Sequence, residues 1–434
     1  MLIAPVTLPI TRSAFAAALR TGHGRVAQQI EQQGCSGFED LIIEACLTCL
    51  AHDPQVEAER APWLFSIIER AQLQEMVFEA IKAKGLAPSC EDRHDLNQRS
   101  ALLKALAVAG MDNAKTLLYA SLARMPDTAD VIAADDIVTL DGVEGLIHVA
   151  RQLGQWLQAD ADFWVDETLY GQFAAAPGAE QGLALLARAA ASDADIARYL
   201  AEVRKTRESV TGCTPDASLA AYTASDIVAH LHNKPADPCH WFRGWGAQAS
   251  GDQREAIFMA LMKTEQPEHA KRLFKCFAKT GAPRFEQRLL RWVDQPDKSL
   301  RWAAVTALAT VKHPELRKTA KHLMAGGDIT NGIALLVKNF VEGDFSTCLE
   351  QLARLENPDE LHRAVGQLLR LCEANPGNQA LDCLLYVYEH SPCSTCRKQA
   401  VKALIDTNTA PGWLLLEAAF DVDPDTRALV APER

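Results

Sequence analysis

Hydrophobic residues recur along most of this chain at the spacing of an amphipathic α-helix. Leu41, Ile42, Ala45 and Cys46 fall at positions i, i+1, i+4 and i+5, which places them on one face of a helix. The same kind of spacing recurs in residues 63–71, 102–109 and 183–189. The pattern therefore predicts an all-α protein made of amphipathic helices.

Alternation of apolar and polar residues, the pattern of a half-buried strand, is nearly absent. Its best example is residues 136–140 (DIVTL), which are followed by the turn-forming pair Asp141-Gly142. Because this stretch is short and isolated, we expect an extended connector there.

Breaks between the predicted helices are closely spaced. Gly, Pro and Asp interrupt the pattern after every ~10–18 residues, which is typical of helices joined by short connections. A long chain built only from such helices predicts stacked helix pairs, about ten of them and uneven in length, rather than one bundle.

One local pattern recurs along the chain: a capping residue, two variable positions, an apolar residue, then Arg. Its two best copies are residues 297–308 (DKSLRWAAVTAL) and 393–404 (CSTCRKQAVKAL), and looser copies begin at Asp53, His313 and Asp423. An Asp at the first position can cap the N–H groups of a helix start, and Pro at the next position costs no hydrogen bond. The apolar and alanine positions are expected to face neighbouring helices.

This pattern resembles the second helix of HEAT repeats, well in residues 297–324 and 393–431 and less closely in residues 53–71. The resemblance implies a right-handed α–α superhelix, a HEAT-like solenoid of stacked antiparallel helix pairs. In that family Asp and Arg form a ladder between successive repeats. By resemblance, that structural role falls to Asp297, Arg301, Arg397, Asp423 and Arg427.

The copies are irregular. Cys393 stands where the family has Asp, and the two best copies start 96 residues apart, which is not a clean multiple of the repeat. We therefore expect divergent repeats with insertions, the likeliest being residues 126–145 and 211–250.

The expected organisation is one continuous solenoid in three parts. These are N-terminal helical repeats in residues 1–125, a divergent helical segment with loop insertions in residues 126–250, and C-terminal HEAT-like repeats in residues 251–434.

Composition narrows the class of protein. Of the 434 residues, 48% are hydrophobic and 23% are charged, as in ordinary soluble globular proteins. The 44 basic and 56 acidic residues give a net charge of −12, which argues against a broad nucleic-acid footprint.

Neither a membrane span nor a secretory signal is expected, since no run of 18 apolar residues occurs and the first Arg is Arg12. The 12 cysteines mostly sit among apolar neighbours, which favours a reduced, cytoplasmic protein.

The N-terminal stretch Thr21-Gly-His-Gly-Arg25 has two interpretations. Its glycines can free backbone amides at a helix start, where an anion would sit beside Arg25. Alternatively, they form a helix C-cap and a turn between the first two helices. A partner-binding patch near this stretch would use His23, Arg25, Glu57 and Arg60.

A second partner-binding candidate is the aromatic cluster of Trp241, Arg243 and Trp245. Trp and Arg are frequent anchors of protein interfaces, but large aromatic residues also fill the core between helices. The nearby His230, His232 and His240 have no carboxylate that completes an obvious site, so surface or core roles are expected for them.

The pair Cys393-x-x-Cys396, with His390 upstream, has the spacing of a metal or redox motif. The repeat accounts for the same pair, because Cys393 falls on the cap position and Cys396 on the buried apolar position. We expect no metal here and no cofactor elsewhere.

Catalytic motifs such as G-x-S-x-G, the P-loop and H-E-x-x-H are absent. The expected function is a non-enzymatic scaffold or adaptor that binds another protein on the concave face. An alternative is nucleic-acid binding through basic residues of 263–321, namely Lys271, Arg272, Lys275, Arg288, Arg317 and Lys321. A third is a HEAT-like lyase or chaperone acting on a protein substrate.

Overall fold

Helices account for nearly all of the regular structure, as the hydrophobic spacing predicts. The computed structural model describes residues 4–87, 92–125, 130–211 and 219–431. Within these ranges the only strands are β1 (Ala123–Arg124) and β2 (Val131–Ile132), which pair antiparallel. The all-α class is therefore confirmed. No helix in the described ranges combines the length and the apolar character needed to cross a membrane.

The chain divides into two units whose boundaries differ from the expected ones. Unit 1 contains residues 215–412 together with Met1–Ala4, and unit 2 contains residues 5–214 and 413–434. Unit 1 is thus an insertion in the sequence of unit 2. The expected boundaries near residues 125 and 250 both fall inside a unit.

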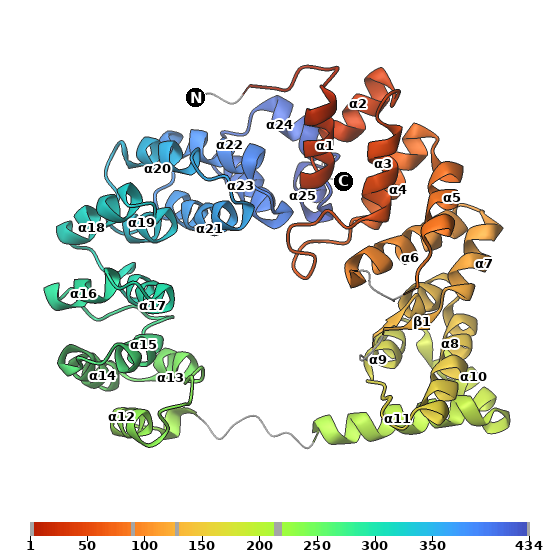
Figure 1. Ribbon diagram of the computed structural model, residues 1–434, viewed down its shortest axis with the longest axis horizontal. Coiled ribbons are helices and arrows are strands. Elements are labelled where there is room, and N and C mark those ends of the chain that lie inside the picture. Colours follow the sequence, from red (N-terminus) through yellow and green to blue (C-terminus); the bar gives the residue numbers. More distant parts are fainter. Residues whose placement is uncertain (1–3, 88–91, 126–129, 212–218, 432–434) are drawn as a thin grey trace. The chain divides into compact units, whose positions relative to one another are not determined.

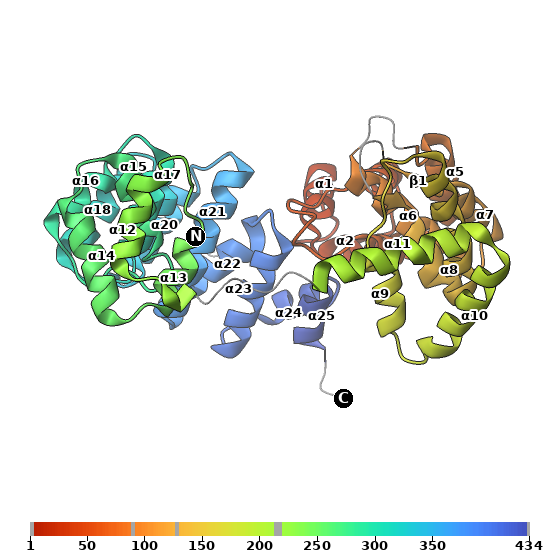
Figure 2. The same ribbon diagram turned by 90° about the horizontal axis from the view of Figure 1, so that it is seen from below.

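Unit 1 is built from helices that pair in sequence order (Figures 1 and 2). From α14 onward, each even-numbered helix packs against the odd-numbered helix that follows it. The odd-numbered helices from α13 to α23 also contact one another in turn, and we call them the odd layer. The helices are α12 (Ala224–Asn233), α13 (Phe242–Gln248), α14 (Gly251–Lys263), α15 (Pro267–Lys275), α16 (Leu290–Val293), α17 (Lys298–Leu308), α18 (Pro314–Ala325), α19 (Ile329–Leu336), α20 (Asp344–Leu352), α21 (Pro358–Ala374), α22 (Leu381–His390) and α23 (Ser394–Asp406).

Unit 2 combines helices from both ends of the sequence. Its helices are α1 (Arg12–Thr21), α2 (Arg25–Gln33), α3 (Glu39–Leu47), α4 (Ala61–Ala71), α5 (Gln74–Lys84), α6 (Arg93–Val108), α7 (Asp112–Ala120), α8 (Ala134–Ala159), α9 (Thr168–Ala175), α10 (Ala179–Ser192), α11 (Ala194–Thr211), α24 (Gly412–Ala418) and α25 (Pro424–Val430). Figure 1 shows α24 and α25 beside α1, within the same unit.

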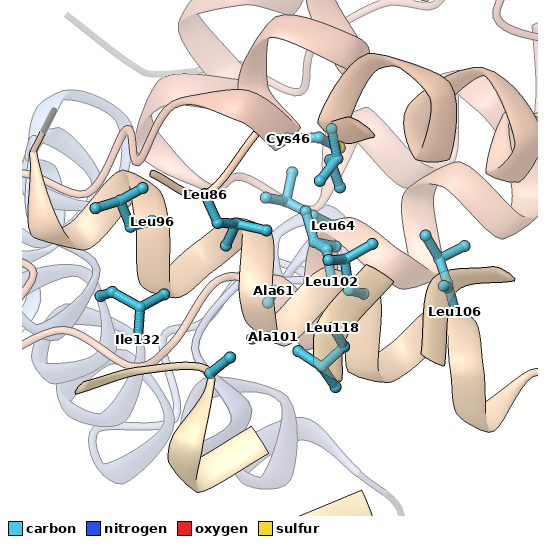
Figure 3. Packing of buried hydrophobic residues seen from close by; sticks show 14 of the residues in the cluster. Cys46, Ala61, Leu64, Leu86, Leu96, Ala101, Leu102, Leu106, Leu118 and Ile132 are labelled. Atoms are coloured by element: carbon cyan, nitrogen blue, oxygen red, sulfur yellow. The ribbon is translucent and has the colours of Figure 1, made fainter. Parts of the chain in front are cut away.

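The core of unit 2 is a continuous apolar cluster (Figure 3). Leu64 of α4, Leu102 of α6 and Leu118 of α7 lie close together and are almost fully buried. Val422, from the segment between α24 and α25, belongs to the same cluster. The C-terminal segment is therefore part of this core. Burial of each such side chain stabilises the fold by roughly 1.5–3 kcal/mol.

The helix starts follow the sequence signals. Thr11 caps α1, Asp297 caps α17 and Asp423 caps α25, each through a side-chain oxygen that accepts a backbone N–H. Prolines stand in the first turn of α4, α15, α18, α21 and α25.

Residues 136–140 are helical rather than extended, so the expected connector is wrong. They lie in α8, where Ile137 and Val138 are buried. Burial of these β-branched residues outweighs their weak preference for helix. The break that the sequence signals comes at Gly142, whose φ of 59° and ψ of −127° kink α8.

The two expected insertions are mostly regular structure. Residues 126–129 and 212–218 lie outside the described residues. The rest of 126–145 contains β2 and the start of α8, and the rest of 211–250 contains α12 and α13.

Candidate functional site

The four N-terminal candidates lie in the interior of unit 2. His23, Arg25, Glu57 and Arg60 are all between 2% and 8% exposed. A partner-binding patch needs accessible side chains, so the expected surface patch is wrong at these positions. His23 and Arg25 instead contact Glu417 of α24, while Arg60 binds the end of α1 and pairs with Glu57.

The turn between α1 and α2 receives the carboxylate of Glu417 from α24. Gly22 is the left-handed C-cap of α1, in agreement with the second interpretation of this stretch. His23 Nδ1 lies 3.0 Å from Glu417 Oε1, and Arg25 Nε donates to the same oxygen at 2.9 Å. The position beside Arg25 that the sequence offered to an anion is therefore taken by a side chain of the protein itself.

Glycine makes this close approach possible. A Cβ atom on Gly24 would lie 1.9 Å from the carbonyl oxygen of Glu417, and one on Gly22 would lie 2.3 Å from Val422 Cγ1. Any larger residue at either position would push the C-terminal segment away from α1 and α2.

Glu417 stays ionised in this interior site. Burial alone raises the pKa of Glu417, but the hydrogen bond from His23 and the charges of His23 and Arg25 outweigh it and lower the pKa to about 2. Arg60 acts nearby: its Nη1 donates to the carbonyl oxygens of Leu19 at 3.1 Å and Arg20 at 2.8 Å, at the end of α1.

The aromatic candidates are largely core residues. Trp245 is 1% exposed and its Nε1 donates to the carbonyl oxygen of Tyr222 at 2.8 Å. Trp241 is half-buried against the rings of Tyr222 and His230, at centroid distances of 5.0 and 5.3 Å. Only Arg243 is exposed, so Trp245 is corrected from an interface anchor to a core residue.

A ladder of ion pairs does run along unit 1, with partly different members from those implied by the resemblance. Arg301 Nη1 lies 2.8 Å from Asp328 Oδ2, and Asp297, the cap of α17, accepts from Lys271 at 3.0 Å. Arg317 makes two hydrogen bonds to Asp344, at 2.7 and 3.0 Å. In each pair the carboxylate lies 26 or 27 residues after the base.

The other expected ladder residues have different surroundings. Arg427 donates to the carbonyl oxygens of Asp421 and Val422, in the segment just before α25, and Asp423 caps α25. Arg397 is fully buried in α23.

The six basic residues of the nucleic-acid alternative all have partners inside unit 1. Lys271 pairs with Asp297, Arg288 with Glu265, and Arg317 with Asp344. Arg272 and Lys275 donate to the carbonyl oxygens of Pro235 and Pro238, and Lys321 lies 3.8 Å from Asp344. Carbonyl oxygens do not neutralise Arg272 and Lys275, so this pairing offsets only part of the positive charge. What disfavours binding of a phosphate backbone is the net charge of −12.

A groove over the odd layer offers accessible side chains instead. It has a volume of about 720 Å³ and is lined by residues of α17, of the turn before α19, and of α21. The turn contributes Gly326 and Gly327, and α21 contributes Gly366. A Cβ on Gly327 or Gly366 would meet nothing within 4 Å, so the glycines leave open space in the groove.

The lining of the groove includes a polar network. Asp328 Oδ2 accepts from Arg301 at 2.8 Å and from Asn331 Nδ2 at 2.9 Å. Asn331 is 8% exposed, and neither its Oδ1 nor Arg301 Nε has a hydrogen-bond partner among the described residues. One acceptor and one donor of the network are therefore buried and unsatisfied.

An aromatic ring and two cations also line the groove. Trp302 of α17 is 40% exposed. Lys298 of α17 and Arg363 of α21 are exposed and form no ion pair with the described residues, while Glu360 is an exposed carboxylate in the same lining. This arrangement suits a ligand that carries an apolar side chain, which would meet Trp302, and a negative charge, which would meet Lys298 and Arg363.

Unit 2 has a separate cavity of about 540 Å³ beside α8 and α11. Trp164 and Asp166 lie at its rim and are exposed, and the buried hydroxyl of Tyr199 has no hydrogen-bond partner among the described residues. Burial and the nearby Asp166 raise the pKa of Tyr199, which keeps this hydroxyl protonated.

Two groups of metal-ligating side chains also converge. His362, Cys393 and Cys396 form one group, and His230, Asp237 and Cys239 form the other. Within each group the potential ligand atoms lie within 4.8 Å of one another. The first contains the expected Cys pair, but the histidine that meets it is His362 rather than His390.

Sequence reasoning named Arg301 only as a ladder residue and missed the other groove residues, although one signal was available. In the two best repeat copies, Trp302 aligns with Lys398. A tryptophan where the related copy has lysine marks an outward-facing aromatic residue. No comparable pattern points to Asn331 or Arg363, because the groove forms only when three helices pack together.

Known proteins supply no further assignment. Comparisons of this chain with known protein families, with curated proteins and with solved structures found no match. Membership in the HEAT-repeat family therefore stays a prediction from the repeated sequence pattern.

Proposed function

We propose that this protein is a non-enzymatic adaptor that binds an extended segment of a partner protein in the groove over α17, α19 and α21. The observation that carries the proposal is an exposed Trp302 beside two cations without ion-pair partners, Lys298 and Arg363. Tryptophan and arginine contribute strongly to protein interfaces.

The polar network supports a polypeptide ligand in particular. A peptide backbone presents one N–H donor and one C=O acceptor per residue. Asn331 Oδ1 and Arg301 Nε are an unsatisfied acceptor and donor of the matching kind, buried in the lining of the groove, and peptide binding would have to expose them. Trp302 adds a preference for a segment with an apolar side chain, and the charges of Lys298 and Arg363 add a preference for carboxylates.

The test is selection of random peptides on the purified protein, followed by affinity measurement on variants. We expect selected peptides to be acidic and to contain an aromatic or large aliphatic residue. Trp302→Ala should weaken their binding at least tenfold, because truncation of an aromatic anchor at an interface costs about 2 kcal/mol or more. Lys298→Glu with Arg363→Glu should shift the selection toward basic peptides.

Matched controls come from outside the groove. Trp164→Ala removes another exposed tryptophan, and Lys279→Glu reverses another exposed lysine; both should leave peptide affinity unchanged. Peptides whose affinity is indifferent to Trp302→Ala and to the charge reversal would contradict the proposal. Retention of nucleic acid that is lost at high salt would favour the nucleic-acid alternative.

A further inference from the structure

We propose that His362, Cys393 and Cys396 bind a zinc ion in unit 1. Their ligand atoms, one imidazole nitrogen and two sulfurs, all lie within 4.8 Å of one another. Tetrahedral zinc with bonds of about 2.0–2.3 Å holds such atoms roughly 3.3–3.8 Å apart, so small side-chain shifts complete the site.

The fold brings the ligands together from separate elements. Cys393 is the N-cap of α23, Cys396 lies in its first turn, and His362 lies in the first half of α21. The two helices contact each other in the odd layer. The site therefore spans two neighbouring helix pairs, and an ion would tie them together.

The backbone before Cys393 is held in place. Ser391 Oγ donates to the carbonyl oxygen of Cys393 at 3.0 Å and accepts from the Cys393 N–H at 3.2 Å. Ser391 is fully buried, so this turn is part of the packed interior. The first ligand is thus positioned without an ion.

Ligand chemistry selects zinc. Two thiols and one imidazole are soft and borderline ligands, which suit zinc and not calcium or magnesium. Three protein ligands leave a fourth position for water or for a group of a bound molecule. His362 also lines the groove, so the ion would lie at the edge of the groove.

Zinc binding must displace the thiol protons, because the ligand is the thiolate. Each Cys converted from S–H to a Zn–S bond releases one proton, and His362 binds as the neutral imidazole. The thiolates lie at the N-terminus of α23, a 13-residue helix whose dipole favours negative charge there.

The second convergent group serves as an internal comparison. Asp237 is already engaged with His230 Nε2 at 2.6 Å and with the N–H of Cys239 at 2.8 Å. Cys239 supplies the single thiol of this group, whereas the first group supplies two. We therefore assign the ion to the group with two thiols.

The experiment uses the full-length protein, reduced and freed of metal. Zinc is titrated against a chromophoric chelator, and cobalt(II) is added in parallel as a spectroscopic probe. We expect one equivalent of zinc, released protons, and a cobalt spectrum with the strong visible bands of a tetrahedral site and a thiolate charge-transfer band.

Ligand variants and matched controls distinguish this site from zinc binding elsewhere on the chain. Cys393→Ser, Cys396→Ser and His362→Ala should each weaken zinc binding by at least a hundredfold and abolish the cobalt spectrum, with helical circular dichroism retained. His390→Ala and Cys239→Ser should bind zinc as the wild type does.

Several results would overturn the assignment. They are the absence of stoichiometric zinc, binding that survives His362→Ala, and loss of binding in Cys239→Ser. Rapid formation of a Cys393–Cys396 disulfide that excess zinc does not slow would assign the pair to redox chemistry instead. None of these results bears on peptide binding, which is measured separately.

Discussion

Glu417 is a carboxylate held inside unit 2 by two side chains from the other end of the sequence. His23 and Arg25 lie 394 and 392 residues before it. Placing a charge in the interior is costly unless opposite charge and hydrogen bonds compensate for it, and removal of one partner exposes that cost. This cluster is therefore a sensitive point of unit 2.

We expect Glu417→Gln to lower the free energy of unfolding of unit 2 on the order of 3 kcal/mol near neutral pH. The pKa of Glu417 is lowered from 4.5 to about 2, so its contribution is full above pH 4.5 and disappears as the pH falls toward 2. Urea unfolding of the wild type and the variant across this pH range measures the difference.

The control is Glu31→Gln, in an exposed pair with Arg70 at 2.7 Å in the same unit. Exposed pairs contribute about 0.2–1 kcal/mol, so this variant should change stability little. Equal losses for the two variants, or a difference independent of pH, would contradict the expectation.

Ion pairs between successive elements form the ladder of unit 1, and they differ in burial. The side chain of Asp344 is 1% exposed beside Arg317, whereas Asp328 is 22% exposed beside Arg301. A carboxylate in the interior depends on its partner more strongly than one that water also reaches.

We accordingly expect Arg317→Ala to reduce the free energy of unfolding by about 2 kcal/mol, because Asp344 loses two charged hydrogen bonds. Arg301→Ala, at the equivalent ladder position, should cost less than about 1 kcal/mol. Chemical unfolding of both variants compares them. A larger loss for Arg301→Ala would show that burial of the carboxylate does not decide these energies.

Individual elements could be predicted from the sequence where local signals decide. Hydrophobic spacing predicted the helices, and Asp297 and Pro314 marked helix starts correctly. Local signals failed at residues 136–140, where burial of Ile137 and Val138 overrides their propensity. The groove and the His362–Cys393–Cys396 group could not be predicted, because their members meet only through contacts between helices.

At the scale of the whole molecule, unit 1 interrupts unit 2 in the sequence. Residues 413–434 complete unit 2 through Glu417, through Val422, and through the carbonyl oxygen of Phe420, which accepts from Trp63 Nε1 at 2.9 Å. The N-terminal helices α1, α2 and α4 consequently depend on the C-terminal segment.

Deletion of residues 413–434 should destabilise α1, α2 and α4 and leave the odd layer of unit 1 intact. Amide hydrogen exchange measures the local stability of each helix separately. We expect protection in α1 and α2 to fall by at least tenfold, and protection in α17, α19 and α21 to stay within twofold of the wild type. Unchanged exchange in α1 and α2 would show that the C-terminal segment is dispensable for unit 2.

Because unit 2 is made of two separate stretches of sequence, its folding during translation must wait for the second stretch. At about 5–20 residues per second, a ribosome that has made Arg25 needs roughly 20–80 s to reach Glu417, 392 residues later. Throughout that interval the glycine turn at Gly22 and Gly24 lacks the segment that covers it. Unit 1, whose residues are all synthesised before Trp413, is thus the first of the two to be complete, although residues 5–214 of unit 2 precede most of it. In a nascent chain, the N-terminal part of unit 2 therefore stays uncovered and accessible to chaperones until α24 and α25 have been synthesised.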